Sequence, residues 1–181
     1  MDGSTILDLA IGAVAAVTTE VIVVIAPDAP APALPSNARI VRDLEAFGGP
    51  LVGLAAALNA TEAPVAIVVG GDMPRLRPAV LEAMRAALPS PPGAAAVVLA
   101  DESGPRPLPI VLGTAARLPL AVALASGEHS LRAFLDRLSV VALAPADWRP
   151  LDPDGDTLVD IDRPEDLERV RASDPAGRRL P

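Results

Sequence analysis

The chain has 181 residues, of which 51% are hydrophobic and 2% aromatic, so one core can be built mainly from aliphatic side chains. A formal charge of −8 and the absence of tyrosine disfavour partners that offer a phosphate backbone or bases for stacking, and we expect no nucleic-acid partner. Without cysteine the chain has no disulfide, thiolate nucleophile or zinc–sulfur site. We predict one domain over residues 1–172 and a flexible tail over 173–181.

The first predicted elements are a helix over residues 5–17 and an apolar strand over 21–25. Polar side chains interrupt the apolar stretch over residues 6–26, so it does not predict a membrane span. These side chains are Asp8, Thr18, Thr19 and Glu20. The first residues lack the basic segment that opens a secretory signal, and we expect a soluble cytoplasmic protein with no membrane partner.

A proline-rich connection over residues 27–35 comes next, and it is interpreted either as a mobile flap or as an inert connector. A short strand is predicted over residues 39–41, and it leads into Arg42-Asp43. A helix is predicted through residues 53–58, with Pro50 in its first turn. Asp43 thus follows a strand, and a Gly-Gly pair precedes Pro50.

The most informative segment contains an all-apolar strand over residues 65–69, followed by Gly70-Gly71-Asp72-Met73-Pro74. The β-branched residues of this strand predict an interior position with both faces covered. The two glycines allow a sharp turn and the close approach of a ligand. Asp72 comes directly after them, at the place where open α/β sheets bind ligands, beyond the carboxyl ends of the strands. It is interpreted either as a ligand-binding or metal-binding carboxylate, or as a turn residue that hydrogen-bonds its own backbone.

The rest of the chain continues the alternation of helices and strands. Helices are predicted over residues 78–88, 118–125, 131–138 and 164–172, and strands over 95–100, 140–143 and 158–161. Residues 106–112 are predicted to form an irregular extended segment. Ser130 is predicted to be the N-cap of the helix over residues 131–138. This alternation predicts an α/β layered domain with a largely parallel sheet.

Carboxylates gather at the ends of the predicted strands, at Asp43, Asp72 and the pair Asp160 and Asp162. Residues at i and i+2 of a strand point to the same face, so Asp160 and Asp162 can share one site. Mg²⁺ is the expected metal in such a site because it binds oxygen ligands together with substrate phosphates. The alternative for Asp162 is a capping role, because Asp-Arg-Pro-Glu-Asp has the pattern of an N-cap followed by proline and an acidic first turn.

All 15 basic residues are arginines, so no lysine is available to hold a phosphate or to form a Schiff base. A phosphate clamp must therefore use arginine, backbone amides, a helix N-terminus or a metal ion. Arg106 and the single histidine, His129, are interpreted as solvated surface residues.

Several sequence blocks occur in an order and at spacings that point to one family. They are Gly49 to Leu58, Gly71-Asp72-Met73-Pro74, Arg106-Pro107-Leu108-Pro109, Gly127 to Arg132, and Asp160 to Leu167. Through these blocks the chain, from about Asp2 to Val170, resembles the molybdenum cofactor guanylyltransferase family (MobA-type). The resemblance implies one nucleotidyltransferase-like α/β domain, with a three-layer, Rossmann-like fold and a mostly parallel sheet.

The resemblance also implies an activity, namely transfer of GMP from MgGTP to molybdopterin or Mo-molybdopterin with release of pyrophosphate. The implied partners are GTP, molybdopterin or Mo-molybdopterin, and molybdoenzyme insertion chaperones. Carried over to the matching positions, Asp72 is the catalytic residue that binds Mg²⁺ and the nucleotide phosphates. The implied nucleotide-binding residues are Asp43, Gly49, Pro50, Leu51 and Asp72. The residues implied on the pterin side or near the metal are Ser130, Arg132, Asp160 and Asp162.

The resemblance has one departure, at the start of the sequence. The family opens with a strand and a glycine-rich loop that wraps the triphosphate and supplies a lysine, whereas Met1 to Leu7 resemble only the segment after that loop. We therefore expect the first strand of the family's sheet to be missing from this sequence. Two explanations stay open: an assigned start that lies too late, or a non-catalytic relative that binds a nucleotide or a partner. A cytidylyltransferase of the same fold is a further alternative, because a few loop residues decide the choice of base.

Overall fold

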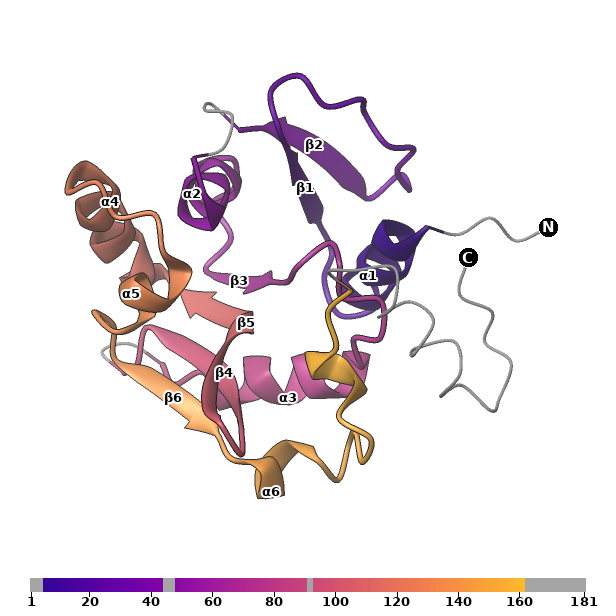
Figure 1. Ribbon diagram of the computed structural model, residues 1–181, viewed down its shortest axis with the longest axis vertical. Helices are drawn as coiled ribbons and strands as arrows, with labels where there is room; N and C mark the ends of the chain where they lie inside the picture. Colours follow the sequence, from indigo (N-terminus) through magenta and orange to yellow (C-terminus); the bar gives the residue numbers. More distant parts are fainter. Residues whose placement is uncertain (1–4, 44–47, 91–92, 162–181) are drawn as a thin grey trace.

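The computed structural model describes residues 5–43, 48–90 and 93–161, in which helices alternate with strands (Figure 1). The α-helices are α1 (Ile6–Ala15), α2 (Pro50–Asn59), α3 (Pro78–Ala87), α4 (Arg117–Ala125), α5 (Leu131–Leu135) and α6 (Pro145–Trp148). The strands are β1 (Val21–Ile25), β2 (Ala38–Arg42), β3 (Val65–Val68), β4 (Ala96–Asp101), β5 (Gly104–Gly113) and β6 (Val140–Leu143). Two short 3-10 helices, η1 (Thr114–Ala116) and η2 (Asp156–Leu158), complete the set. The predicted α/β class is confirmed.

The strands form two sheets in the described part of the chain. Strands β1 and β2 pair in parallel, and the second sheet has the order β3-β5-β4-β6 (Figure 1). Strands β4 and β6 are parallel, whereas β5 runs antiparallel to both β3 and β4. The four-stranded sheet is therefore mixed, the two-stranded sheet is parallel, and both antiparallel pairings involve β5.

Strand β5 corrects one prediction, because residues 106–112 lie within a ten-residue strand rather than in an irregular segment. The prolines at 107 and 109 suggest irregular structure because proline cannot donate to a sheet ladder. In the observed register β3 pairs with residues 110–113 of β5, and β4 pairs with residues 104–105 and 110–112. The two prolines thus lie in a stretch that neither neighbour pairs with, where they cost no ladder hydrogen bond.

Two buried clusters lie on opposite faces of the larger sheet. Val97 and Leu99 of β4 pack into a first cluster with α1, α3 and Trp148 of α6. Ala96 and Val98, which alternate with them, pack into a second cluster with α2, α4 and α5. Because alternate residues of a strand face opposite sides, the sheet is covered on both faces. The predicted three-layer arrangement is confirmed.

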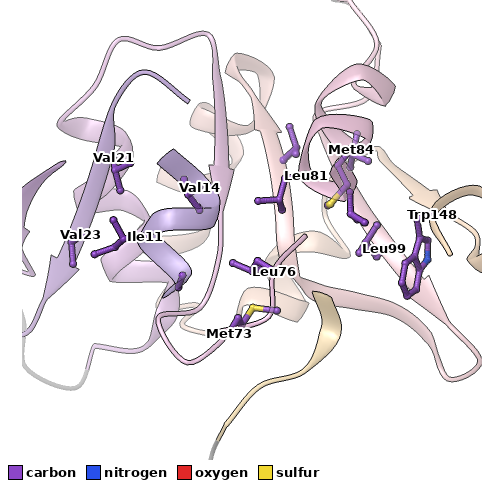
Figure 2. Close-up of a cluster of buried hydrophobic side chains, with 14 residues drawn as sticks. Ile11, Val14, Val21, Val23, Met73, Leu76, Leu81, Met84, Leu99 and Trp148 are labelled. Atoms are coloured by element: carbon purple, nitrogen blue, oxygen red, sulfur yellow. The ribbon is translucent and has the colours of Figure 1, made fainter. Parts of the chain in front are cut away.

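The loop after β3 is anchored in the first cluster. Figure 2 shows Met73 and Leu76 in this cluster with Leu81 and Met84 of α3, and Met73 and Leu76 are only 4% and 5% exposed. At roughly 25 cal/mol per Å² of apolar surface, burying two such side chains stabilises the loop by a few kcal/mol. Asp72, the residue before Met73, is exposed. The loop is therefore anchored in the core by Met73 and Leu76, while the carboxylate of Asp72 faces solvent.

The helix starts agree with the predicted chemistry. Thr5 accepts the backbone N–H of Asp8, whose carboxylate accepts the N–H of Thr5 in return, so α1 begins with a capping box. Proline stands in the first turn of α2 and of α3, at Pro50 and Pro78. The Ser130 hydroxyl accepts the N–H of Ala133 at 3.3 Å, which confirms the predicted cap of α5.

The segment predicted as a strand over residues 158–161 is not one. Leu158 closes η2, and residues 159–161 pair with neither sheet. The predicted arrangement of Asp160 and Asp162 on one strand face cannot apply, and Asp162 lies outside the described residues. So do the predicted helix 164–172 and the tail 173–181. None of the helices that the structure describes is long and apolar enough to cross a bilayer.

Candidate functional site

Asp72 is presented by a tight turn after β3. A Cβ atom on Gly70 would lie 2.2 Å from Asp72 Oδ1, so the carboxylate occupies space that any other residue at position 70 would fill. The Gly70 N–H donates to Met73 Sδ at 3.4 Å, and the Met73 N–H donates to the Gly70 carbonyl at 3.4 Å. The glycine and the buried methionine together fix where the carboxylate lies.

A small open hollow of about 120 Å³ lies beside this carboxylate. It is lined by Asp72, Met73, Arg106, Pro107, Leu108, Leu158 and Asp160. Two carboxylates and one guanidinium therefore border the same space. A hollow of this size, open to solvent on one side, has room for a hydrated ion or a phosphate group.

Asp160 reaches this hollow through a backbone contact with the Asp72 turn. The Ile161 N–H donates to the Asp72 carbonyl at 3.0 Å, and this bond joins the segment after η2 to the turn after β3. The structure thus brings Asp72 and Asp160 together, although Asp160 is not on a strand. The predicted roles of both carboxylates remain predictions, and their shared hollow is the geometry those roles need.

Arg106 lies on a strand rather than in a loop, it keeps partial exposure to solvent, and its side chain also lines this hollow. It lies on β5, its Nη1 is 3.2 Å from Asp101 Oδ2, and its side chain is 37% exposed. A guanidinium that is paired on one side and still borders an open hollow can also contact an anion there. Arg106 is the one charged residue within an otherwise apolar and proline-rich strand, but that pattern alone does not place it beside the hollow.

A second group of predicted residues gathers at the start of α2. Gly49 has φ +82°, and a Cβ there would lie 3.2 Å from both the Cβ and the backbone oxygen of His129. His129 Nδ1 lies 2.7 Å from the Gly48 carbonyl oxygen, so the loop before α5 rests on this turn. Asp43 is close as well, since its Oδ2 lies 3.7 Å from the position that a Cβ on Gly53 would take. The structure therefore places Gly49 against His129 of the loop over residues 127–130, and Asp43 against Gly53 of α2.

The side chain of Leu51 points away from any ligand. It is fully buried in the second cluster, so the predicted nucleotide contact of this residue is confined to its backbone. Pro50, one position earlier, is exposed in the first turn of α2. The sequence could not separate these two roles, because a Gly-Pro-Leu turn looks the same whether its leucine is in the core or at a ligand.

The loop before α5 is ordered by a charged side chain. The Glu128 carboxylate accepts the N–H groups of Ser130 at 2.9 Å and His129 at 3.0 Å. These hydrogen bonds, of which the one from Ser130 has the largest effect, hold the pKa of Glu128 below its ordinary value. The positive charge of Arg137, 3.4 Å away, acts in the same direction. His129 is exposed, as predicted.

Ser130 and Arg132, the two residues assigned to the pterin side, have different surroundings. The Ser130 hydroxyl is engaged as a helix cap. Arg132 Nη2 donates to the Pro105 carbonyl at 3.4 Å, one residue before Arg106. Strand β5 thus connects the group at α2 and α5 with the hollow beside Asp72.

The hollow suits a divalent cation whose coordination shell is completed by oxygens of the substrate. Within residues 5–43, 48–90 and 93–161, no three carboxylate or imidazole side chains gather closely enough to hold a metal ion. Mg²⁺ is commonly bound by only one or two carboxylates, together with waters and substrate phosphates. Asp72 and Asp160 border the hollow with two carboxylates, and its open side leaves room for phosphate.

Comparison with known proteins decides the family. Residues 1–142 match the family model of the MobA-like NTP transferase domain. The chain belongs to this family. The resemblance noted in the sequence is thereby confirmed, and the MobA-like domain covers β3, β5 and the Asp72 turn.

Two curated relatives agree with this assignment of the MobA-like domain. A probable molybdenum cofactor guanylyltransferase from Chloroflexus aggregans is 32% identical over 173 residues, which cover 94% of the chain and 81% of that protein. A molybdenum cofactor guanylyltransferase from Burkholderia ambifaria is 35% identical over 120 residues, which cover 64% of the chain. The match spans 58% of the Burkholderia protein, less than two thirds of its length.

A solved structure of the same kind confirms the nucleotidyltransferase fold of the MobA-like domain. The molybdopterin-guanine dinucleotide biosynthesis protein A from Archaeoglobus fulgidus superposes with a TM-score of 0.61 at 26% identity. The superposition covers 74% of the chain and 66% of the Archaeoglobus protein.

Proposed function

We propose that this MobA-like domain is a Mg²⁺-dependent guanylyltransferase, which transfers GMP from GTP to molybdopterin or Mo-molybdopterin and releases pyrophosphate. The observation that carries the proposal is the hollow bordered by Asp72, Asp160 and Arg106, which offers metal-binding oxygens and a cation in one place. The names of the Chloroflexus and Burkholderia relatives support the choice of reaction. A cytoplasmic location and delivery of the product to molybdoenzyme insertion chaperones are further predictions.

In this reaction a terminal phosphate oxygen of the pterin attacks the α-phosphorus of GTP. The bond from that phosphorus to the bridging oxygen breaks, and pyrophosphate leaves with the electron pair. Asp72 and Asp160 would hold the cation, which when bound neutralises phosphate charge and aligns the attacked group. Arg106 would contact a phosphate oxygen from the other wall of the hollow, replacing the lysine that the chain lacks.

The nucleoside would lie toward the second group of residues. Gly49 lies against the loop over residues 127–130, Pro50, the next residue, is exposed, and Asp43 lies against Gly53 of α2. The base or ribose would contact these residues. Arg132 would hold the phosphate of the pterin substrate, because it lies between this group and the hollow. Ser130 would contribute mainly by keeping α5, and so Arg132, in place.

The experiment that tests the proposal measures pyrophosphate and dinucleotide formation from GTP and molybdopterin by the wild type and Asp72→Asn. We expect turnover to fall by roughly a hundredfold or more, since a charged group at the reacting phosphates is lost. The thermal unfolding midpoint should stay near that of the wild type, because the Asp72 side chain is exposed. Glu82→Gln is the matched control, since Glu82 forms an exposed ion pair with Arg85 on α3.

Each other outcome has its own meaning. Equal turnover by the wild type and Asp72→Asn would remove Asp72 from the site. Turnover with CTP but not with GTP would show a cytidylyltransferase of the same fold. Nucleotide binding by the wild type without any turnover would favour the non-catalytic alternative.

A further inference from the structure

One carboxylate bridges two arginines between the loop that carries Asp72 and the segment that leads to Asp160. Asp156 Oδ1 lies 2.9 Å from Arg75 Nη1, and Asp156 Oδ2 accepts a hydrogen bond from Arg77 Nη2. The side chain of Asp156 is 12% exposed and that of Arg75 14%, so the pairing is largely removed from water. Both arginines belong to the loop that carries Asp72, and Asp156 opens η2.

A second, fully buried carboxylate supports this bridge. Asp152 accepts the N–H of Thr157 at 2.7 Å and that of Asp156 at 3.2 Å, and its Oδ1 lies 3.6 Å from Arg77 Nε. The Thr157 hydroxyl, also fully buried, accepts the N–H of Arg77 at 3.1 Å. Main chain and side chains thus both tie residues 75–77 to residues 152–157.

We call Asp156, Arg75 and Arg77 the clamp. A buried ion pair of this kind adds little net stability relative to apolar side chains, because each charge must be stripped of water. Removal of one partner, by contrast, leaves a buried charge without compensation. The clamp is therefore better suited to fixing the position of two segments than to stabilising the fold.

The two segments joined by the clamp are the ones that carry the carboxylates of the hollow. Arg75 follows Asp72 by three residues, and Thr157 precedes Asp160 by three. Beyond the clamp the segments meet again, where the Ile161 N–H donates to the Asp72 carbonyl. Asp72 and Asp160 are thus held at a set spacing between the clamp and this bond.

We propose that the clamp positions Asp72 and Asp160 and thereby sets the affinity of the hollow for a divalent cation. The clamp residues are positioning residues, because the hollow is lined by other side chains and they act through the two carboxylates. The inference rests on the proposed function, in which these two carboxylates bind the metal. It adds that metal affinity depends on residues that do not touch the metal.

The test uses Asp156→Asn, which keeps the size of the side chain and removes its charge. Mn²⁺ serves as the probe, and its affinity is measured from the spin-resonance signal of the free ion. Hydrogen exchange of the Ile161 amide, followed by NMR, reports directly on the junction with Asp72. We expect Mn²⁺ affinity and Ile161 protection each to fall by roughly tenfold, in the range seen when groups supporting metal ligands are changed.

Two further variants separate positioning from a general loss of structure. Asp156→Glu keeps the charge between the two arginines and should retain most of the Mn²⁺ affinity. Glu82→Gln, which breaks an exposed ion pair on α3, should change neither readout. If Asp156→Asn does not fold, Arg75→Gln removes one of the two cations and should lower Mn²⁺ affinity in the same direction.

A folded Asp156→Asn variant with wild-type Mn²⁺ affinity would overturn the proposal that the clamp sets the metal affinity. Unchanged exchange of the Ile161 amide would overturn it as well, because the two segments would then stay joined without Asp156. A wild type that binds no Mn²⁺ would overturn the proposed metal site instead. The clamp would in that case be judged on the Ile161 exchange alone.

Discussion

At the scale of single residues, the close approach of Asp72 to Gly70 makes position 70 a sharp probe of the site. A Cβ at this position would come within 2.2 Å of Asp72 Oδ1, and the cheapest relief is rotation of the carboxylate. We therefore expect Gly70→Ala to lower turnover and Mn²⁺ affinity by roughly tenfold or more, as misplacement of a positioned group does. The unfolding midpoint should also fall somewhat, because the added Cβ would lie 3.2 Å from Cγ of the buried Met73, which must shift to make room.

Gly12→Ala is the matched control for this prediction. Gly12 lies inside α1, is exposed, and has no heavy atom within 4 Å of its missing Cβ. Alanine there should leave activity unchanged and stabilise the protein by about 0.5–1 kcal/mol, because glycine loses more backbone entropy in a helix. Normal activity of Gly70→Ala would show that the orientation of the Asp72 carboxylate does not matter.

Single residues also show how far the sequence predicted the site. The position of Asp72 in a turn at the end of a strand was predictable, because an apolar strand followed by two glycines and a carboxylate has a direct physical meaning in an α/β sheet. Arg106 was not, because whether an arginine borders a hollow depends on how β5 lies against the Asp72 turn. The buried side chain of Leu51 depends in the same way on the packing of α2, which no local pattern shows.

At the scale of elements, the turn before α5 depends on the ionised form of Glu128. The amides of Ser130 and then His129 keep the pKa of this carboxyl below its ordinary value. Above about pH 4.3, the ordinary glutamate value, the group is ionised whether the chain is folded or not, and its stabilisation is fully present. As the pH falls through the lower pKa of the folded state, that stabilisation is lost.

Glu128→Gln should therefore flatten the acid side of the stability profile. We expect the wild type to lose more stability than this variant as the pH falls below about 4.3, and the difference between the two proteins to be constant above that pH. The measurement is the urea midpoint as a function of pH. Asp8 and Glu20, whose pKa values are also lowered, are present in both proteins and cancel in the difference. Parallel profiles would contradict this account of the turn.

The elements differ in how well local sequence predicts them. Strand β1 and strand β6 have the predicted bounds, since an apolar run flanked by polar residues and turns leaves few alternatives. Residues 158–161 were misjudged because Val159 and Ile161 favour a strand locally, whereas buried Asp152 binds the amides at the start of η2 and turns the chain. Helix α6 was missed for a related reason. It is only four residues long, and it is held by Trp148 in the core.

At the scale of the whole molecule, the two clusters share the four-stranded sheet, and we propose that the described residues unfold as one unit. Leu112→Ala tests this, because Leu112 lies in the second cluster at 1% exposure, whereas Trp148, the single tryptophan, lies in the first. The substitution should cost about 2–5 kcal/mol. If the described residues unfold as one unit, the free energy of unfolding should fall by this amount whether unfolding is followed by tryptophan fluorescence or by circular dichroism.

Leu118→Ala is the control for this experiment, because Leu118 is 74% exposed and should not alter the transition. A shift in circular dichroism without a matching shift in Trp148 fluorescence would show two units rather than one.

The central claim is that the hollow beside Asp72 binds the phosphates of GTP through a divalent cation. The most direct measurement is calorimetric titration of the chain with GTP in the presence of Mg²⁺, repeated without Mg²⁺ and with CTP and ATP. The account predicts Mg²⁺-dependent binding that prefers GTP and is lost in Asp72→Asn. A folded chain that binds no nucleotide, or binds GTP equally well without Mg²⁺ and in Asp72→Asn, would contradict it.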